Sequence, residues 1–150
     1  TKTHLELENI EKLQRIDEQK YQPNGGTPLY DAIGQSVNKL RRTTDLVPNC
    51  NVLVTILTDG EENASREYSG AAIKALIEEM KEKKWTFTYI GTEHDVEKVA
   101  HNLSINNTMK FDKSEASMSN MFIKESKARH AYFNKISNNE NVESNYYEEI

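Results

Sequence analysis

The feature that most constrains the fold is the segment from Val52 to Leu57, VLVTIL, in which aliphatic and β-branched residues follow one another without alternation. A strand with one face in water alternates polar and apolar residues, whereas a parallel strand covered by helices on both faces is apolar throughout. The turn residues Thr58, Asp59 and Gly60 end the segment. We therefore expect a central strand of a parallel α/β sheet.

The segments around this strand alternate between helix and strand patterns. Residues 65–84 carry an apolar stripe at helical spacing, and residues 85–90 alternate aromatic residues with threonine, so the three segments predict a right-handed strand–helix–strand crossover. A helix over 28–42, with Thr27 as its N-cap, is expected upstream. The remaining expected elements are a turn or two of helix around Ile10, Leu13 and Ile16, a helix over 95–103, a strand over 109–111 and a helix over 114–136.

This order predicts a doubly wound, Rossmann-like parallel sheet with helices on both faces. The most hydrophobic strand comes first in the chain, and one of its edges has no evident partner. We therefore expect a sheet that lacks its N-terminal strands, and we expect its exposed edge to promote self-association. The domain is expected to span residues 1–136. Residues 137–150 contain four Glu, four Asn and no cation, which predicts an acidic, mobile tail.

Composition excludes several classes of function. The net charge of −5 argues against nucleic acid as the main partner, because phosphate binding needs a cationic surface. No run approaches the roughly 18 apolar residues that cross a bilayer, so we expect no membrane insertion. The single cysteine, Cys50, excludes an intramolecular disulfide and a cysteine-based zinc site. The absence of a visible signal peptide slightly favours the cytoplasm, although a chain that begins at Thr1 leaves the compartment open.

Two short motifs carry the chemistry, GGTPL at 25–29 and TDGEEN at 58–63. Asp59 follows the carboxyl end of the buried strand, where ligands bind in open α/β sheets. The Thr27 hydroxyl lies at the start of a predicted helix. Together these oxygens would be hard ligands, suited to Mg²⁺, Mn²⁺ or Ca²⁺, and Mg²⁺ keeps positions for further ligands. Each motif alone is also an ordinary helix start or turn.

In this order the motifs GGTPLYDAI at 25–33 and VLVTILTDG at 52–60 resemble the von Willebrand factor A (vWA) domain family, over about residues 21–136. The resemblance implies a doubly wound fold with a metal-ion-dependent adhesion site (MIDAS), at which a protein partner's acidic side chain binds through the metal. Thr27 matches the threonine of the family's second metal loop, and Asp59 matches the aspartate of its third. The first metal loop, D-x-S-x-S, does not occur in the sequence. We therefore expect an incomplete site, either in a truncated domain or in one completed by another chain.

The residues expected to form a rim around the ligand of this site are Gly26, Gly60, Glu61, Glu62 and Asn63.

Other interpretations compete with the adhesion module. One alternative is a scaffold that binds partners without metal. Another is a metal-dependent hydrolase or phosphoryl-transfer enzyme that uses Asp59. The phosphate-loop, G-x-S-x-G and H-E-x-x-H motifs are absent, so we expect no enzymatic activity. A zinc site formed by His94, Glu97 and His101 is weaker still, because solvated helix faces are more common.

Overall fold

Three parallel strands, β1 (Val52–Thr58), β2 (Trp85–Gly91) and β3 (Asn107–Lys110), form a sheet in the order β1-β2-β3. In this computed structural model, residues 9–12, 26–92, 95–142 and 146–147 are described. Val52 pairs with Trp85, and Thr88 pairs with Asn107. The fold is α/β with a parallel sheet flanked by helices, as expected. Within the described ranges, no strand pairs with the other edge of β1.

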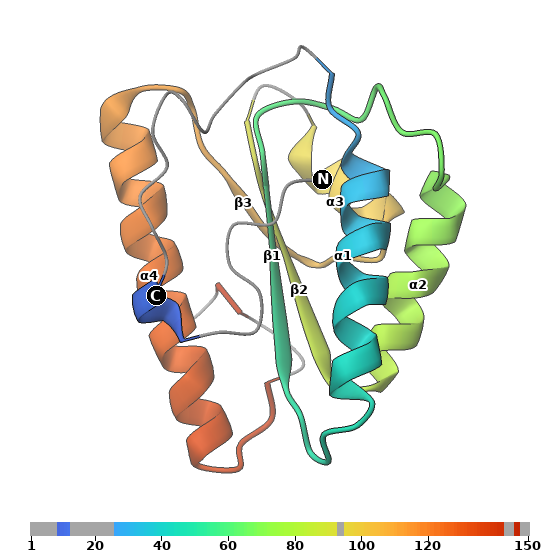
Figure 1. Cartoon of the computed structure of the whole chain (residues 1–150). Coiled ribbons are helices and arrows are strands. Elements are labelled where there is room, and N and C mark those ends of the chain that lie inside the picture. The colour runs from blue at the N-terminus through green and yellow to red at the C-terminus, as the bar shows by residue number, and fades with distance from the viewer. Residues whose placement is uncertain (1–8, 13–25, 93–94, 143–145, 148–150) are drawn as a thin grey trace.

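Helices cover both faces of the sheet (Figure 1). On one face lie α1 (Leu29–Thr44), α2 (Gly70–Glu82) and α3 (Val96–Asn102), which share one core with the strands. On the other face lies α4 (Glu115–Ser137). A short 3₁₀ turn covers Ile10–Lys12. In the part of the chain that is described, no helix is both long and apolar enough to cross a membrane.

The alternating sequence of β2 explains how the two faces are built. Trp85, Phe87 and Tyr89 point into the core shared with α1, α2 and α3, and all seven residues of β2 are buried. The predicted stripe of α2 is the surface that packs on them, namely Ile73, Leu76, Ile77 and Met80. Successive side chains of a strand point to opposite faces, so the bulky aromatic residues lie on the side that three helices cover.

Several expected boundaries are wrong. The helix expected from residue 65 begins at Gly70, because the Ser69 hydroxyl accepts the Ala72 N–H and caps it there. Thr27 is not the N-cap of α1, which begins at Leu29 without a side-chain cap from its own N-cap residue. The third strand covers residues 107–110 instead of 109–111. Of the expected early helix, the described residues Ile10–Lys12 form a 3₁₀ turn, and Leu13 and Ile16 lie outside the described residues.

The expectation of a mobile tail is wrong for Tyr146 and Tyr147. Tyr146 is buried against Ala128 and Tyr132 of α4, and its backbone N–H donates to Asn107 Oδ1 at 3.1 Å. Tyr147 packs against the same cluster. Aromatic side chains can anchor an otherwise polar segment because they bury a large area. The rest of residues 143–150 lies outside the described part of the chain.

Candidate functional site

Thr27 and Asp59 lie on two adjacent loops at the carboxyl end of the sheet. The loop before α1 and the loop after β1 are joined by a pair of bonds: Thr27 N–H donates to Asn63 Oδ1 at 2.8 Å, and Asn63 N–H donates to the Thr27 carbonyl at 3.2 Å. A Cβ built on Gly60 would lie 3.6 Å from Thr27 Oγ1. The structure therefore brings the two sequence motifs together.

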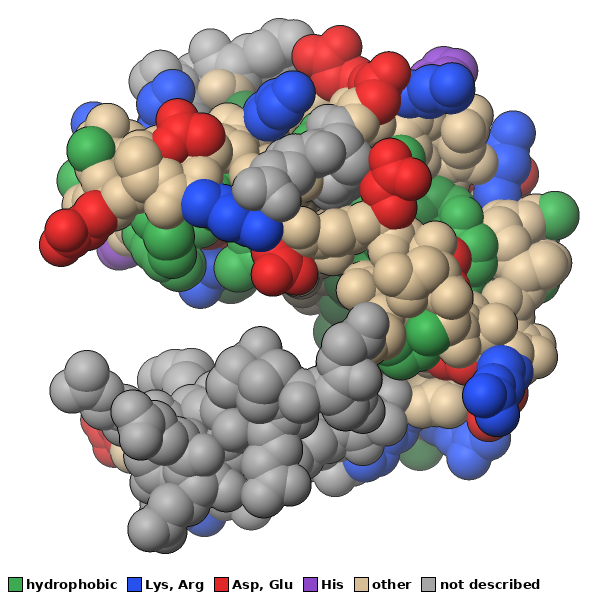
Figure 2. Space-filling view, turned by 90° about the horizontal axis from the view of Figure 1, so that it is seen from above, with side chains coloured by type: hydrophobic (Ala, Val, Ile, Leu, Met, Phe, Trp, Pro, Cys, Tyr) green, Lys and Arg blue, Asp and Glu red, His purple; other side chains and the backbone are tan. Residues whose placement is uncertain are grey.

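Among the described residues, no group occupies the side-chain oxygens of Thr27 and Asp59. The Asp59 side chain is exposed, and Thr27 is half-buried. Neither the Asp59 carboxylate nor the Thr27 hydroxyl makes a hydrogen bond or an ion pair with the described part of the chain. Figure 2 looks onto this end of the molecule, where Asp and Glu side chains are spread among Lys and Arg side chains. This end of the molecule is thus a surface of mixed charge.

Glu62, expected on the rim, is engaged with the start of α1. Its Oε2 accepts the Tyr30 N–H at 2.8 Å and the Ser65 hydroxyl at 2.7 Å, while its Oε1 accepts the N–H groups of Ala64 and Ser65 at 2.9 and 2.6 Å. Burial raises the pKa of Glu62, but these hydrogen bonds outweigh it and hold the pKa below its ordinary value. Glu62 therefore supplies the cap that Thr27 does not.

Asp31 has a matching role in the opposite direction, which sequence reasoning missed. Its carboxylate accepts the backbone N–H groups of Arg66, Glu67 and Tyr68 at 2.9, 2.9 and 3.0 Å. The Arg66 N–H lowers the pKa of Asp31 most, and the net pKa stays below its ordinary value although burial opposes the shift. An acidic residue in the first turn of a helix is common, so the sequence gives no signal of this long-range contact.

The other rim residues divide into two kinds. Gly26 and Gly60 let the loops approach, since a Cβ on Gly26 would lie 3.2 Å from the Ala64 Cβ. Asn63 is used to join the loops through Thr27. Of the two rim acids, Glu61 is exposed and takes no part in the contacts that hold Glu62.

The Thr27 and Asp59 oxygens fit a hard cation as ligands, but they supply only part of its coordination. A hydroxyl and a carboxylate are oxygen ligands of the type that Mg²⁺, Mn²⁺ and Ca²⁺ prefer, and Mg²⁺ is commonly held by one or two carboxylates and several waters. Among the described residues, no three His, Cys, Asp or Glu side chains are grouped to hold a metal ion. Of the three residues in the zinc hypothesis, His94 lies outside the described residues, and Glu97 and His101 are exposed.

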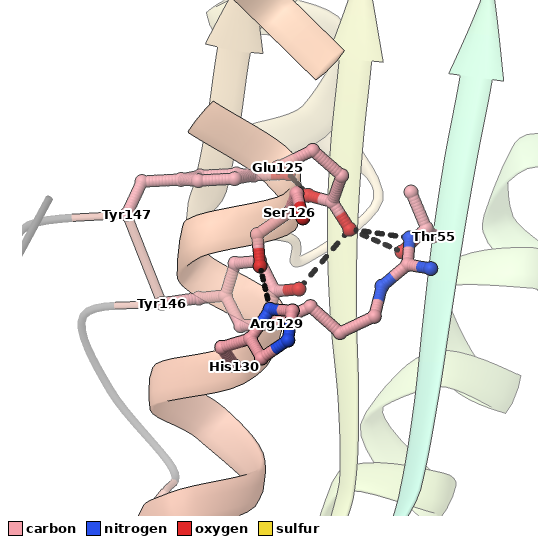
Figure 3. A network of polar contacts seen from close by, with 7 residues as sticks. All are labelled: Thr55, Glu125, Ser126, Arg129, His130, Tyr146 and Tyr147. Carbon is pink, nitrogen blue, oxygen red and sulfur yellow. Dashed lines mark hydrogen bonds and ion pairs between the residues drawn. The ribbon is translucent and has the colours of Figure 1, made fainter. Parts of the chain in front are cut away.

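A second polar centre lies between α4, β1 and the C-terminal tyrosines (Figure 3). Glu125 is buried, and its Oε1 accepts from Arg129 at 2.9 Å and from the Tyr146 hydroxyl at 3.1 Å. Its Oε2 accepts the Tyr147 hydroxyl at 3.0 Å, and the Thr55 hydroxyl donates to Oε1 at 3.5 Å. Burial raises the pKa of both tyrosines, so the hydroxyls remain protonated donors. This network fastens the chain end to α4.

Comparisons of the chain with protein-family models, with curated proteins and with solved structures found no match. The geometry and the motifs therefore carry the functional argument.

Proposed function

We propose that this chain belongs to a vWA-type protein-interaction module. In this proposal Thr27 and Asp59 are two ligands of a divalent cation, Mg²⁺ or alternatively Mn²⁺ or Ca²⁺, and a protein partner binds the cation through an acidic side chain. One observation carries the proposal: the Thr27 hydroxyl lies beside the loop of Asp59, and both side chains are without a partner in the described part of the chain. The order of the two motifs supports it.

The two residues would contribute differently. Asp59 would supply negative charge at the exposed end of the sheet, and Thr27 would supply a neutral oxygen held in place by its backbone bonds to Asn63. The remaining ligands would be waters, residues outside those described, or groups of another chain. A partner carboxylate could then replace a water, because Mg²⁺ retains several waters when proteins supply few ligands.

Calorimetric titration of Mg²⁺ and Mn²⁺ into the chain tests the assignment. We expect Asp59→Ala to abolish the heat of binding and Thr27→Ala to weaken binding about tenfold, the usual effect of losing one ligand interaction of about 1.4 kcal/mol. The control is Asp45→Ala, which removes the same charge near the other end of α1. An absence of binding, or binding unchanged in both site variants, contradicts the proposal.

Exposed apolar side chains on α4 favour a second candidate, a scaffold that binds partners without metal. Phe122, Ile123 and Phe133 are each about half exposed, and Phe122 and Phe133 line one groove with Arg129 and His130. Capture of a partner in EDTA distinguishes the two: a metal-dependent module loses its partner, whereas a scaffold retains it. An enzyme would instead show turnover that Asp59→Ala abolishes, and we expect none.

A further inference from the structure

We infer that Asp31 and Glu62 are positioning residues that lock Thr27 and the Asp59 loop into one rigid unit. The inference deepens the proposed function, on which its consequence for cation affinity rests. This lock is a property of the metal-free chain, so an experiment without metal tests it independently of the proposed function.

The contacts between α1 and the loop after β1 are reciprocal. The first turn of α1 donates the Tyr30 N–H to Glu62 and the Asp31 N–H to the Ser65 hydroxyl oxygen. In return, the loop donates the backbone N–H groups of residues 66–68 to the Asp31 carboxylate. The Ser65 hydroxyl donates to Glu62 Oε2 at 2.7 Å, so it links the Asp31 backbone N–H to the Glu62 carboxylate. Each side of the junction thus supplies both an acid and the donors for the other acid.

Two physical reasons make this junction stiff. Hydrogen bonds to a carboxylate are shorter and stronger than those between neutral groups. The Glu62 carboxylate also lies at the start of α1, where the N-terminal N–H groups lack helical partners and the helix dipole favours an anion. The junction adjoins both candidate ligands, because Thr27 is two residues before the helix and Asp59 is three residues before Glu62.

The consequence concerns how firmly Thr27 and Asp59 are held in position before a cation binds. A cation held by Thr27 and Asp59 needs both oxygens at fixed positions, and ligands that must be ordered on binding reduce the affinity. Asp31 and Glu62 need not touch the cation to act. They fix one loop against the other before binding.

Glu62→Gln is a selective test of this arrangement. A Gln side chain keeps one acceptor oxygen, which can retain the turn bonds to Ala64 and Ser65, but its amide nitrogen cannot accept the Tyr30 N–H. The matched control is Glu67→Gln, which removes the same charge from the same loop. Glu67 is exposed, and among the described residues its side chain accepts a hydrogen bond from the side chain of Gln35 alone.

Amide hydrogen exchange followed by NMR in the absence of metal measures the lock. In Glu62→Gln we expect the amides of Thr27, Tyr30 and Asn63 to exchange about tenfold faster or more, as expected for the loss of one hydrogen bond to a charged group. The amides of Ile77 and Tyr89 in the core should be unchanged, and Glu67→Gln should match the wild type. Equal exchange at Thr27 in wild type and Glu62→Gln, or equal acceleration in the core, overturns the inference.

Mn²⁺ titration then tests the functional consequence. We expect Glu62→Gln to weaken Mn²⁺ binding about tenfold, the equivalent of 1.4 kcal/mol, with Glu67→Gln unchanged. In a Thr27→Ala background the same substitution should have little further effect, which a general loss of stability would not produce. Additive effects contradict the positioning role. If the wild type binds no Mn²⁺, the proposed function fails, while the exchange experiment still decides whether the lock exists.

Discussion

At the scale of single residues, Glu125 is the side chain whose surroundings matter most for stability. It is buried, and four donors converge on its two oxygens. Removing an acid from such a network leaves buried donors without a partner, so Glu125→Ala should destabilise the protein by about 3 kcal/mol. Tyr146→Phe removes one donor and should cost about 1 kcal/mol. Urea unfolding followed by the fluorescence of Trp85 measures both, and a loss below about 1 kcal/mol for Glu125→Ala contradicts the account.

Glu62 and Asp31 predict how stability depends on pH. Both have a folded-state pKa below the ordinary value, which is 4.5 for Glu62 and 3.8 for Asp31. Their contribution is therefore fully present above the ordinary pKa and is lost as the pH falls through the lower folded-state pKa. We expect the urea midpoint to fall as the pH drops below about 5, and Glu62→Gln should make this fall shallower. An equal pH slope in the variant would exclude Glu62 as a contributor.

At the scale of elements, the contact between α1 and the loop that precedes α2 reverses a common rule. Gly→Ala in a helix usually stabilises by about 1 kcal/mol. A Cβ on Gly34 of α1, however, would lie 2.7 Å from the ring of Tyr68, whose hydroxyl is also held by Asn38. We expect Gly34→Ala to lower the melting temperature, because the ring and loop must move. In a Tyr68→Ala background the same substitution should be neutral or stabilising, and a loss of the same size there contradicts the contact.

Most elements could be predicted because their signals are local. The apolar run of β1, the aromatic alternation of β2 and the stripe of α2 each specify their own structure and burial. The start of α2 could not be predicted from local signals. Asp31, more than thirty residues away, holds the backbone of residues 66–68 outside the helix. The cap of α1 was missed for the same reason, since it comes from Glu62 across the fold.

The candidate site shows the same division. The alternation of helices and parallel strands predicted that Thr27 and Asp59 lie at the same end of the sheet, and they do. The carboxyl ends of the strands and the loops that precede the helices meet at that end. The use of Glu62 and Asn63 to join the loops was not predictable from a turn-rich motif. The sequence pattern does not distinguish a charged or amide side chain that faces water from one that caps a helix.

At the scale of the whole molecule, the segment after α4 shows that composition alone does not predict which residues contact the rest of the protein. The acidic segment after α4 was expected to be mobile, yet two adjacent tyrosines within it, Tyr146 and Tyr147, are held against α4. Their partner, Glu125, is twenty-one residues upstream of Tyr146. The acids of the segment favour water, but the buried area and hydrogen bonds of two tyrosines favour contact. Average charge does not report such local anchors.

The open edge of β1 predicts how whole molecules interact. In the described part of the chain this edge has no strand beside it, and Leu57 near its end is 50% exposed. An unpaired, uncharged strand edge offers hydrogen-bonding groups to another chain, and a lysine there opposes such pairing. We therefore expect the sedimentation mass to rise above the 17.3 kDa monomer with concentration, and Leu57→Lys to suppress the rise.

Leu46→Lys controls for this effect, because Leu46 is 83% exposed in the loop after α1 and lies outside the strand. It adds the same charge and removes a similar apolar area from the surface. If pairing at the β1 edge drives association, Leu46→Lys should associate like the wild type. Equal suppression by both variants would indicate a general effect of charge. A wild type that stays monomeric at every concentration and unfolds cooperatively would contradict pairing at the β1 edge.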